Sequence, residues 1–158
     1  MGQESSISLL FLCDLCDLLL NRIDFMHLLY QKAAGLTGDV IAAAIEVHRF
    51  FGPGLIESIY EWALLKELEL RNLNACNQKI ITIRYKSFER DEPLRFDILV
   101  EDCVLVEIKA IEDVHPMHKA SLLSYMKLLD IPIGFVINFH TDRLTDGVTR
   151  LILRGADT

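Results

Sequence analysis

Apolar and polar residues alternate along two consecutive stretches in the second half of the chain, residues 93–101 and 103–110. Such alternation is typical of β-strands with one buried face, and the short segment between the stretches predicts a hairpin. Asp97, Glu107 and Lys109 fall in the same phase of the alternation. We therefore expect these three side chains to share one face of the sheet.

The length of the hairpin loop decides whether Asp97 and Glu107 meet. With a three-residue loop at Glu101, Asp102 and Cys103, position 97 lies directly opposite position 107, with Cβ atoms roughly 5 Å apart. A two-residue loop would shift the register by one residue and turn Asp97 away from Glu107. Two carboxylates that close together can hold one divalent cation, so the register is part of the functional hypothesis.

The pattern before these strands predicts two helices. From Thr37, which we expect to be the N-cap, apolar residues recur at helical spacing up to the turn at Gly52-Pro53-Gly54. A second helix should run from about Leu55 to Asn72. These two helices would precede all the strands.

The remaining elements complete one mixed sheet. The pattern predicts a strand at 78–86, a charged hairpin loop at 89–92, a helix at 116–129, a buried strand at 131–139, a turn at 146–147 and a last strand at 148–153. The order is therefore helix, helix, three strands, helix, strand, strand. This order predicts an α/β (α+β) fold with a mixed central β-sheet flanked by helices.

Length and charge narrow the functional classes. A chain of 158 residues with 51% apolar residues has the size and composition of one domain with a single core. Its formal charge of −7 argues against non-specific binding to nucleic acid, because phosphate affinity comes largely from Lys and Arg. Basic residues can still gather locally around Arg84, Lys86, Arg90 and Arg95.

The first 25 residues differ from the rest. The apolar run at 7–20 contains Asp14 and Asp17, is shorter than a membrane span and follows no basic segment, so neither a secretory signal nor a transmembrane helix is predicted. We expect residues 1–25 to be an apolar N-terminal extension, either a read-through from an upstream start codon or a dispensable helix. Residues 26–158 would then form the single domain.

The cysteines favour a cytoplasmic protein. Cys13 and Cys16 have the spacing of metal ligands, but no second pair follows. Reduced cysteines packed in a cytosolic protein are therefore the better interpretation.

Glu57 adds a third carboxylate from another part of the chain. Tyr60, Leu64 and Leu68 follow it at steps of three and four residues, so on a helix Glu57 should face inward and need a charged or metal partner. The alternative is that it lies solvated in the first turn, where the helix dipole favours an acidic residue.

The acidic residues suit a hard divalent cation. Mg²⁺ prefers oxygen ligands, so Asp97, Glu107, Glu57 and the backbone carbonyl of Ile108 would be sufficient. Lys109 beside such a site could orient the attacking water or stabilise the developing negative charge. A second candidate, His115 with His118, has the spacing of a transition-metal pair. A hydrogen-bonded core histidine is the better interpretation of His118, because it lies in line with Leu122, Tyr125 and Leu129.

At these residues the chain resembles the PD-(D/E)XK nuclease superfamily, and more closely the small bacterial group named for its GxxExxY motif. That motif is Gly54-Leu-Ile-Glu57-Ser-Ile-Tyr60, and the resemblance extends over roughly residues 28–153 through Asp97 and Val106-Glu107-Ile108-Lys109. The resemblance implies a restriction-endonuclease-like core, with Glu57, Asp97 and Glu107 as metal ligands and Lys109 as the catalytic lysine. It also implies Mg²⁺, with Mn²⁺ able to substitute.

One position departs from the family pattern. The helix after the third strand usually carries a glutamine where this chain has Ser121, whose shorter side chain reaches less far toward water or phosphate. Gln78 is a candidate to take over this role, and we include Gln78, Ser121 and Tyr60 as supporting residues. The loss of the glutamine would reduce activity unless a neighbour replaces it.

The leading hypothesis is a Mg²⁺-dependent nuclease that hydrolyses DNA phosphodiester bonds, with nucleic acid as partner and a homodimer as one assembly. The first alternative is a catalytically weak or inactive nucleic-acid- or protein-binding module on the same fold. The second is a hydrolase of small phosphoesters or nucleotides, which the acidic charge fits better.

Overall fold

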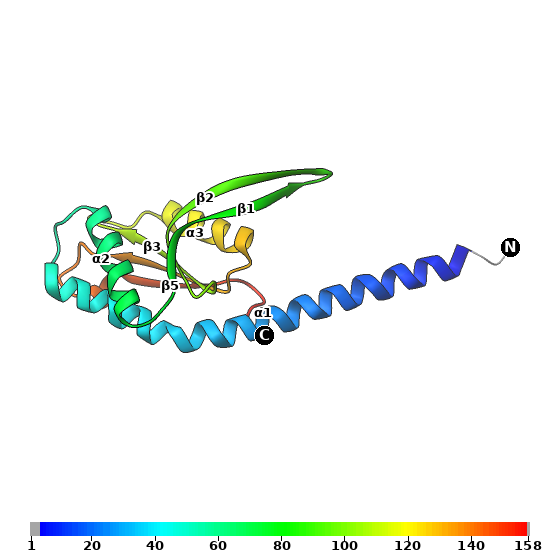
Figure 1. Cartoon of the computed structure of the whole chain (residues 1–158), viewed down its shortest axis with the longest axis horizontal. Coiled ribbons are helices and arrows are strands. Elements are labelled where there is room, and N and C mark those ends of the chain that lie inside the picture. The colour runs from blue at the N-terminus through cyan, green and yellow to red at the C-terminus, as the bar shows by residue number, and fades with distance from the viewer. Residues whose placement is uncertain (1–3, 158) are drawn as a thin grey trace.

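A mixed five-stranded sheet forms the centre of the molecule, with the strands in the order β1-β2-β3-β4-β5 (Figure 1). The computed structural model describes the backbone of residues 4–157 and the side chains of residues 28–157. Its elements are α1 (Glu4–Phe51), α2 (Glu57–Leu70), β1 (Ala75–Tyr85), β2 (Phe88–Val100), β3 (Val104–Lys109), α3 (Pro116–Leu129), β4 (Ile133–Asn138), the 3₁₀ turn η1 (Leu144–Gly147) and β5 (Val148–Ile152). The predicted fold class and element order are therefore confirmed.

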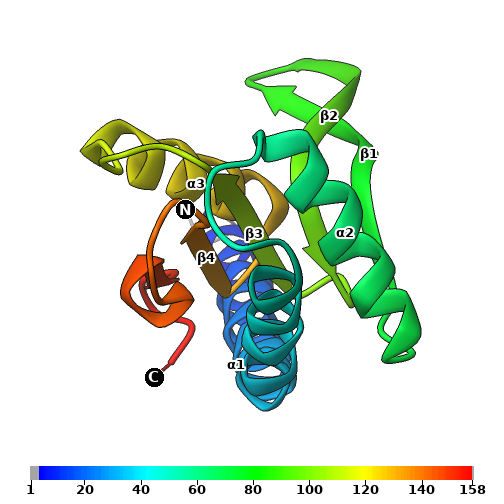
Figure 2. The same cartoon turned by 90° about the vertical axis from the view of Figure 1, so that its left-hand side faces the viewer.

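Helices cover both faces of the sheet. Buried residues of α1 and α2 pack with Val104, Val106 and Ile108 of β3 in one core cluster. On the other face, Leu122 and Met126 of α3 pack with Leu105 in a second cluster. Figure 2 shows this arrangement end-on, with β3 and β4 between α3 and α1. Successive residues of β3 join the two clusters in turn, because neighbouring side chains of a strand point to opposite faces of the sheet.

The first helix begins far upstream of the predicted start at Thr37. α1 is continuous from Glu4 to Phe51, and Thr37 donates its hydroxyl hydrogen back to the Ala34 carbonyl oxygen at 2.8 Å instead of capping a helix. Ala33 and Val40, on either side of Thr37, are both fully buried in the same core cluster. This packing offsets the cost of the two glycines at 35 and 38.

The N-terminal extension stays a prediction. The backbone of α1 passes through positions 25 and 26 without a break, and the side chains of Cys13 and Cys16 lie outside the described residues. Over the part of the chain that the structure describes, we find no helix that is both long and apolar enough to cross a membrane.

The hairpin loop predicted at 89–92 is wrong. β1 and β2 turn at Lys86 and Ser87, and residues 89–92 belong to β2, where Glu89 pairs across the strands with Arg84. The charged segment therefore supplies cross-strand partners and not a loop. The Lys-Ser turn lacks the glycine or asparagine that makes two-residue hairpins recognisable in a sequence.

The three-residue loop between β2 and β3 is confirmed. Ile98 pairs with Val106 and Val100 with Val104, so residues 101–103 connect the strands. Glu101 and Asp102 both adopt a positive φ, 49° and 56°. The pairing ends at Ile98↔Val106, one residue before position 97, so the predicted opposition of positions 97 and 107 stays a prediction.

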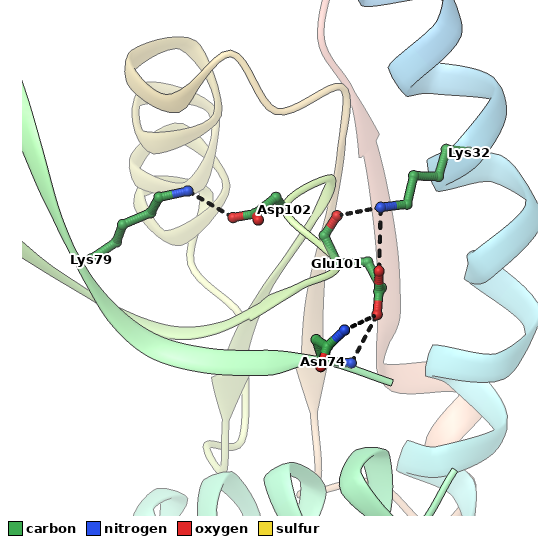
Figure 3. Close-up of polar contacts among 5 residues, drawn as sticks. All are labelled: Lys32, Asn74, Lys79, Glu101 and Asp102. Atoms are coloured by element: carbon green, nitrogen blue, oxygen red, sulfur yellow. Dashed lines mark hydrogen bonds and ion pairs between the residues drawn. The ribbon is translucent and has the colours of Figure 1, made fainter. Parts of the chain in front are cut away.

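A polar network fixes this loop to the rest of the fold. The carboxylate of Glu101 accepts hydrogen bonds from the backbone and side-chain nitrogens of Asn74, each at 2.9 Å, and pairs with Lys32 of α1 at 3.3 Å. Lys79 of β1 pairs with Asp102 at 2.7 Å (Figure 3). The loop is thereby held to α1 and to β1 at once.

Crossing through α3 places β4 parallel to β3, with Glu107 opposite Val136 and Lys109 opposite Asn138. α3 lies tightly on β4 at Gly134, where an added Cβ atom would stand 2.5 Å from Met126 Sδ and 3.2 Å from Leu122 Cδ2. Glycine at this position is therefore required by close packing and not by an unusual backbone angle.

We expect Gly134→Ala to lower the free energy of unfolding by about 1–3 kcal/mol, because the extra methyl group forces apart a packed helix and strand. Urea denaturation monitored by circular dichroism measures this change. Gly38→Ala is the control, since nothing lies within 4 Å of its added Cβ. In a helix it should stabilise by about 0.5–1 kcal/mol. Equal effects of the two substitutions would contradict the packing argument.

Candidate functional site

Asp97 lies in an irregular part of β2. Between the pairs Cys76↔Leu99 and Gln78↔Arg95, β1 contributes one residue and β2 contributes three, of which Asp97 is the middle one. A bulge of this kind bends the strand and re-aims a side chain. The Asp97 Oδ2 atom accepts a hydrogen bond of 2.6 Å from the backbone nitrogen of Ile108 on β3.

The backbone N–H and C=O groups of Ile108 both face the site next to Asp97. Its N–H donates to Asp97, and its carbonyl oxygen accepts from the Lys109 ammonium at 2.8 Å. In an extended strand these two groups point to the same side. Pairing of β2 with β3 ends at Ile98↔Val106, so at Ile108 the edge of β3 carries side-chain partners in place of a neighbouring strand.

Lys109 is a buried ammonium surrounded by oxygen atoms. It is 8% exposed, its Nζ atom lies 2.7 Å from Glu107 Oε1, and Glu57 Oε2 is 3.8 Å away. Burial disfavours its charged form, but the hydrogen bond to Glu107 and the charges of Glu107, Glu57 and Asp97 outweigh burial and raise the pKa of Lys109. Lys109 is therefore a cation at neutral pH and not a base.

Glu57 reaches the site from the first residue of α2. Its Oε1 atom accepts a hydrogen bond of 3.3 Å from the backbone nitrogen of Ala110, just beyond β3. The side chain is 46% exposed and lies in the first turn of α2, where the helix dipole favours an acidic residue. It also has the charged partner expected of an inward-facing carboxylate, because its Oε2 atom is 3.8 Å from the buried Lys109 ammonium.

Tyr60 holds the loop that leads into Glu57. Its buried hydroxyl group donates to the Gly52 carbonyl oxygen at 2.6 Å and accepts from the Leu55 backbone nitrogen at 3.1 Å. The ring stacks on Phe139, with centroids 4.3 Å apart. Gly52 has a φ of 68°, which lets the chain leave α1 sharply. Tyr60 thus positions Glu57 through the loop.

The pKa of Asp97 is raised to about 6. Burial is the largest cause, and the hydrogen bond from Ile108 opposes it. The negative charges of Glu107 and Glu61 raise the pKa further, while Lys109 lowers it. A carboxyl group held in this way carries an unfavourable negative charge at neutral pH, which a bound cation would relieve.

Two contributors were missed in the sequence. Glu61, whose charge acts on Asp97, follows Glu57 by four residues and so lies on the same face of α2; this spacing was the available signal. Asn138 is 3% exposed and bonds both to the backbone nitrogen of Ile111 at 3.2 Å and to its carbonyl oxygen at 2.7 Å. Asn138 thereby fixes the chain just after Lys109. No local pattern in the sequence predicts this contact with Ile111.

In the part of the chain with described side chains, two of the proposed supporting residues, Gln78 and Ser121, are not bonded to the charged residues of the site. Gln78 is exposed on β1 and Ser121 is exposed on α3, and none of the hydrogen bonds and ion pairs resolved among residues 28–157 joins either to the four charged side chains. His115 caps α3 by accepting a hydrogen bond from the Met117 backbone nitrogen at 3.2 Å. His48 bonds through Nε2 to the Thr141 carbonyl oxygen at 2.8 Å.

The chemistry of the donor set fits a hard cation. Asp97 has one carboxylate oxygen beyond the one bonded to Ile108, and Glu107 and the Ile108 carbonyl add further oxygen donors around the Lys109 ammonium. Among the residues with described side chains, however, no three His, Cys, Asp or Glu side chains converge closely enough to form a ready metal cluster.

Comparison with known families gives one match. The model of the PD-(D/E)XK nuclease superfamily matches residues 34–151, which include every residue of the site described above. No curated protein and no solved structure matches the chain.

We expect Asp97→Asn to be more stable than the wild type at pH 8 by about 1 kcal/mol in buffer with EDTA. A raised pKa means that the folded protein holds the proton more tightly than the unfolded chain, so wild-type stability falls as the pH rises from about 4 to above 6. One pKa unit corresponds to about 1.4 kcal/mol, and solvent screening of this part-exposed group reduces the total. Urea titrations across this pH range measure the difference, which should vanish below pH 4. A less stable variant at pH 8 would contradict the cause assigned here.

We expect Tyr60→Phe to lower the free energy of unfolding by about 1–3 kcal/mol, because the Gly52 carbonyl and the Leu55 N–H would lose their buried partner. Tyr85→Phe, at an exposed ring, is the control and should change stability by less than about 0.5 kcal/mol. Thermal or urea unfolding of both variants provides the comparison. Loss of stability in the control alone would refute the assigned role of Tyr60.

Proposed function

Since the chain belongs to the PD-(D/E)XK nuclease superfamily, we propose that it is a Mg²⁺-dependent nuclease that hydrolyses DNA phosphodiester bonds. We also assign it to the group with the GxxExxY motif, through Gly54, Glu57 and Tyr60. The observation that carries the proposal is the meeting of Asp97, Glu107, Lys109 and the Ile108 carbonyl where β2 separates from β3. Oxygen ligands and a cationic side chain side by side are what phosphodiester hydrolysis needs.

The acidic residues bind the metal in this proposal. Asp97, Glu107 and the Ile108 carbonyl hold Mg²⁺, or Mn²⁺ in its place, and Glu57 adds a third carboxylate from the start of α2. The chemistry that the bound ion supplies is a lowered pKa of its water and stabilisation of the charge that develops on the phosphate. The raised pKa of Asp97, about 6, supports the assignment, because a cation relieves the cost of its buried charge.

Lys109 acts on the reacting groups. Its raised pKa keeps the ammonium protonated at neutral pH, so it cannot take a proton from water. It orients the attacking water by donating a hydrogen bond and stabilises the negative charge on the phosphate oxygens. Its present partner, Glu107, holds it at the position from which it does so.

The acidic charge of the chain favours a second candidate, a hydrolase of small phosphoesters or nucleotides. A small substrate occupies the site without a long basic surface, whereas a long duplex needs several phosphate contacts. The exposed position of Ser121, away from the four charged residues, also fits a nucleic-acid- or protein-binding module with little turnover. Substrate tests distinguish the three.

We expect Mg²⁺ binding, measured by titration calorimetry, to be lost in Asp97→Ala/Glu107→Ala. Lys109→Ala should retain metal binding, yet cleave a mixed pool of single- and double-stranded DNA about 10²–10³-fold more slowly, because it removes one stabilising charge from the transition state. Cleavage is followed by gel electrophoresis in Mg²⁺ and in Mn²⁺, beside a panel of mononucleotides and small phosphodiesters.

Asp39→Ala/Asp142→Ala is the matched control, since both carboxylates are exposed and neither is among the groups that act on Asp97 or Lys109. It should bind metal and cleave DNA as the wild type does. Turnover of small phosphoesters alone would favour the second candidate. A folded wild type that binds no metal, with or without DNA, would overturn the nuclease proposal and leave the binding module.

A further inference from the structure

The hairpin of β1 and β2 extends beyond the body of the molecule (Figure 1). We call residues 78–95 the β1–β2 arm. Its two strands pair with each other from Gln78↔Arg95 to Tyr85↔Phe88, whereas β3 pairs with β2 only from Ile98 onward. Only the base is anchored by buried side chains, with Leu94 of the arm in the α3 core cluster. Beyond it the arm has no core of its own.

The arm exposes aromatic and aliphatic side chains. Ile80, Tyr85 and Phe88 are 73%, 66% and 71% exposed. Tyr85 and Phe88 flank the turn, and the Lys86 ammonium lies over the Tyr85 ring, 5.2 Å from its centroid. Isolated exposed apolar residues need no explanation, but aromatic rings beside a cation at the end of a projecting hairpin indicate a contact surface.

The charge of the arm is opposite to that of the chain. Residues 78–95 contain five Lys and Arg against three Asp and Glu, in a chain with a formal charge of −7. Two of the acidic residues, Glu89 and Glu92, are held by Arg84 and Arg90 in ion pairs on the surface. Such exposed pairs are weak and can exchange partners with a phosphate group. Lys79 pairs with Asp102 outside the arm, so the cations available to an anionic partner are those nearer the tip, Arg84, Lys86 and Arg90.

We propose that the β1–β2 arm is a clamp that contacts duplex nucleic acid about one helical turn away from the point of cleavage. A two-stranded β-ribbon fits the major groove of B-DNA. Phe88 and Asp97 are nine residues apart on the same strand, so the tip lies roughly 30 Å from the site at about 3.3 Å per residue. One turn of duplex spans a similar length, about 34 Å. This inference rests on the proposed function, because it takes the site around Asp97 as the cleavage centre.

A second copy of the chain fits the arm less well. The outer edge of β1 has no neighbouring strand, so strand-to-strand dimerisation is open in principle. A two-fold interface would place one arm against the other and bring like charges together. A duplex instead neutralises the basic excess through its phosphates. The charge therefore selects nucleic acid over self-association.

The test measures binding without cleavage. Fluorescence anisotropy in EDTA, from 50 to 200 mM salt, compares a 24-base-pair duplex with a DNA hairpin of six base pairs, which is too short to reach the tip from the site. The arm variant is Arg84→Gln/Lys86→Asn, because asparagine tolerates the positive φ of 57° at Lys86. The control is Arg49→Gln/Lys66→Gln, which removes two exposed cations of α1 and α2 that are ion-paired with glutamates as Arg84 is.

We expect the arm variant to bind the long duplex about 10-fold more weakly and to lower the slope of log affinity against log salt by about 2, since each lost phosphate contact lowers it by about 0.9. Binding to the short hairpin should stay within about twofold, and the control should match the wild type with both probes. If the double variant does not fold, Lys86→Asn alone should give about half the change in slope.

Wild-type affinity of the arm variant for the long duplex would overturn the clamp, as would an equal loss with both probes. Absence of duplex binding by the wild type would do the same, and a dimer that the arm variant dissociates in sedimentation would assign the arm to self-association. Failure of the proposed function is detected by separate measurements, of metal binding and of DNA cleavage. Arm-dependent duplex binding without metal binding or cleavage removes the nuclease, whereas cleavage unaffected by the arm variant removes only the clamp.

Discussion

The register between β2 and β3 is the constraint on which the site depends. Three residues, 101–103, connect the strands, and Glu101 and Asp102 reach the required turn only with positive φ angles. Their strain is compensated by bonds to Asn74, Lys32 and Lys79, which belong to other elements. A shift of one residue would exchange the two faces of β2 and separate Asp97 from Ile108. The register that closes the hairpin therefore also brings the charged residues of the site together.

Lys109 connects the charges that this register brings together. A buried ammonium without partners would be costly, and Glu107, Glu57 and the Ile108 carbonyl compensate its burial. The same carboxylates would be costly without Lys109. Each charged group is therefore stabilised in its position by the others. The site carries opposite charges at neutral pH, since Asp97 has a pKa of about 6 and Lys109 stays protonated. Such mutual dependence is common where charge must be stabilised during a reaction.

Periodicity in the sequence was sufficient for the order of elements, for the α3 boundaries at Pro116 and Leu129, and for the three-residue loop between β2 and β3. It failed where tertiary contacts override local signals. Thr37 suggested the N-cap of a helix, but burial of Ala33 and Val40 carries α1 across this position. The charges at 89–92 suggested a loop, yet they pair across the strands. In the site, Asn138 could not be foreseen, because its bonds to Ile111 join segments 27 residues apart.

The bulge at Asp97 also divides the sheet into parts of unequal local stability. On one side, β3 and β4 are buried on both faces; on the other, the arm relies on pairing between two exposed strands, which is marginal in water. Amide hydrogens of the arm should therefore exchange with solvent far faster than those of β3, and the change should occur at the bulge. A carboxylate at such a junction can adjust its position through small openings of the arm while Glu107 and Lys109 stay fixed on the rigid strand. The molecule thus combines an adjustable carboxylate with an immobile pair of charges.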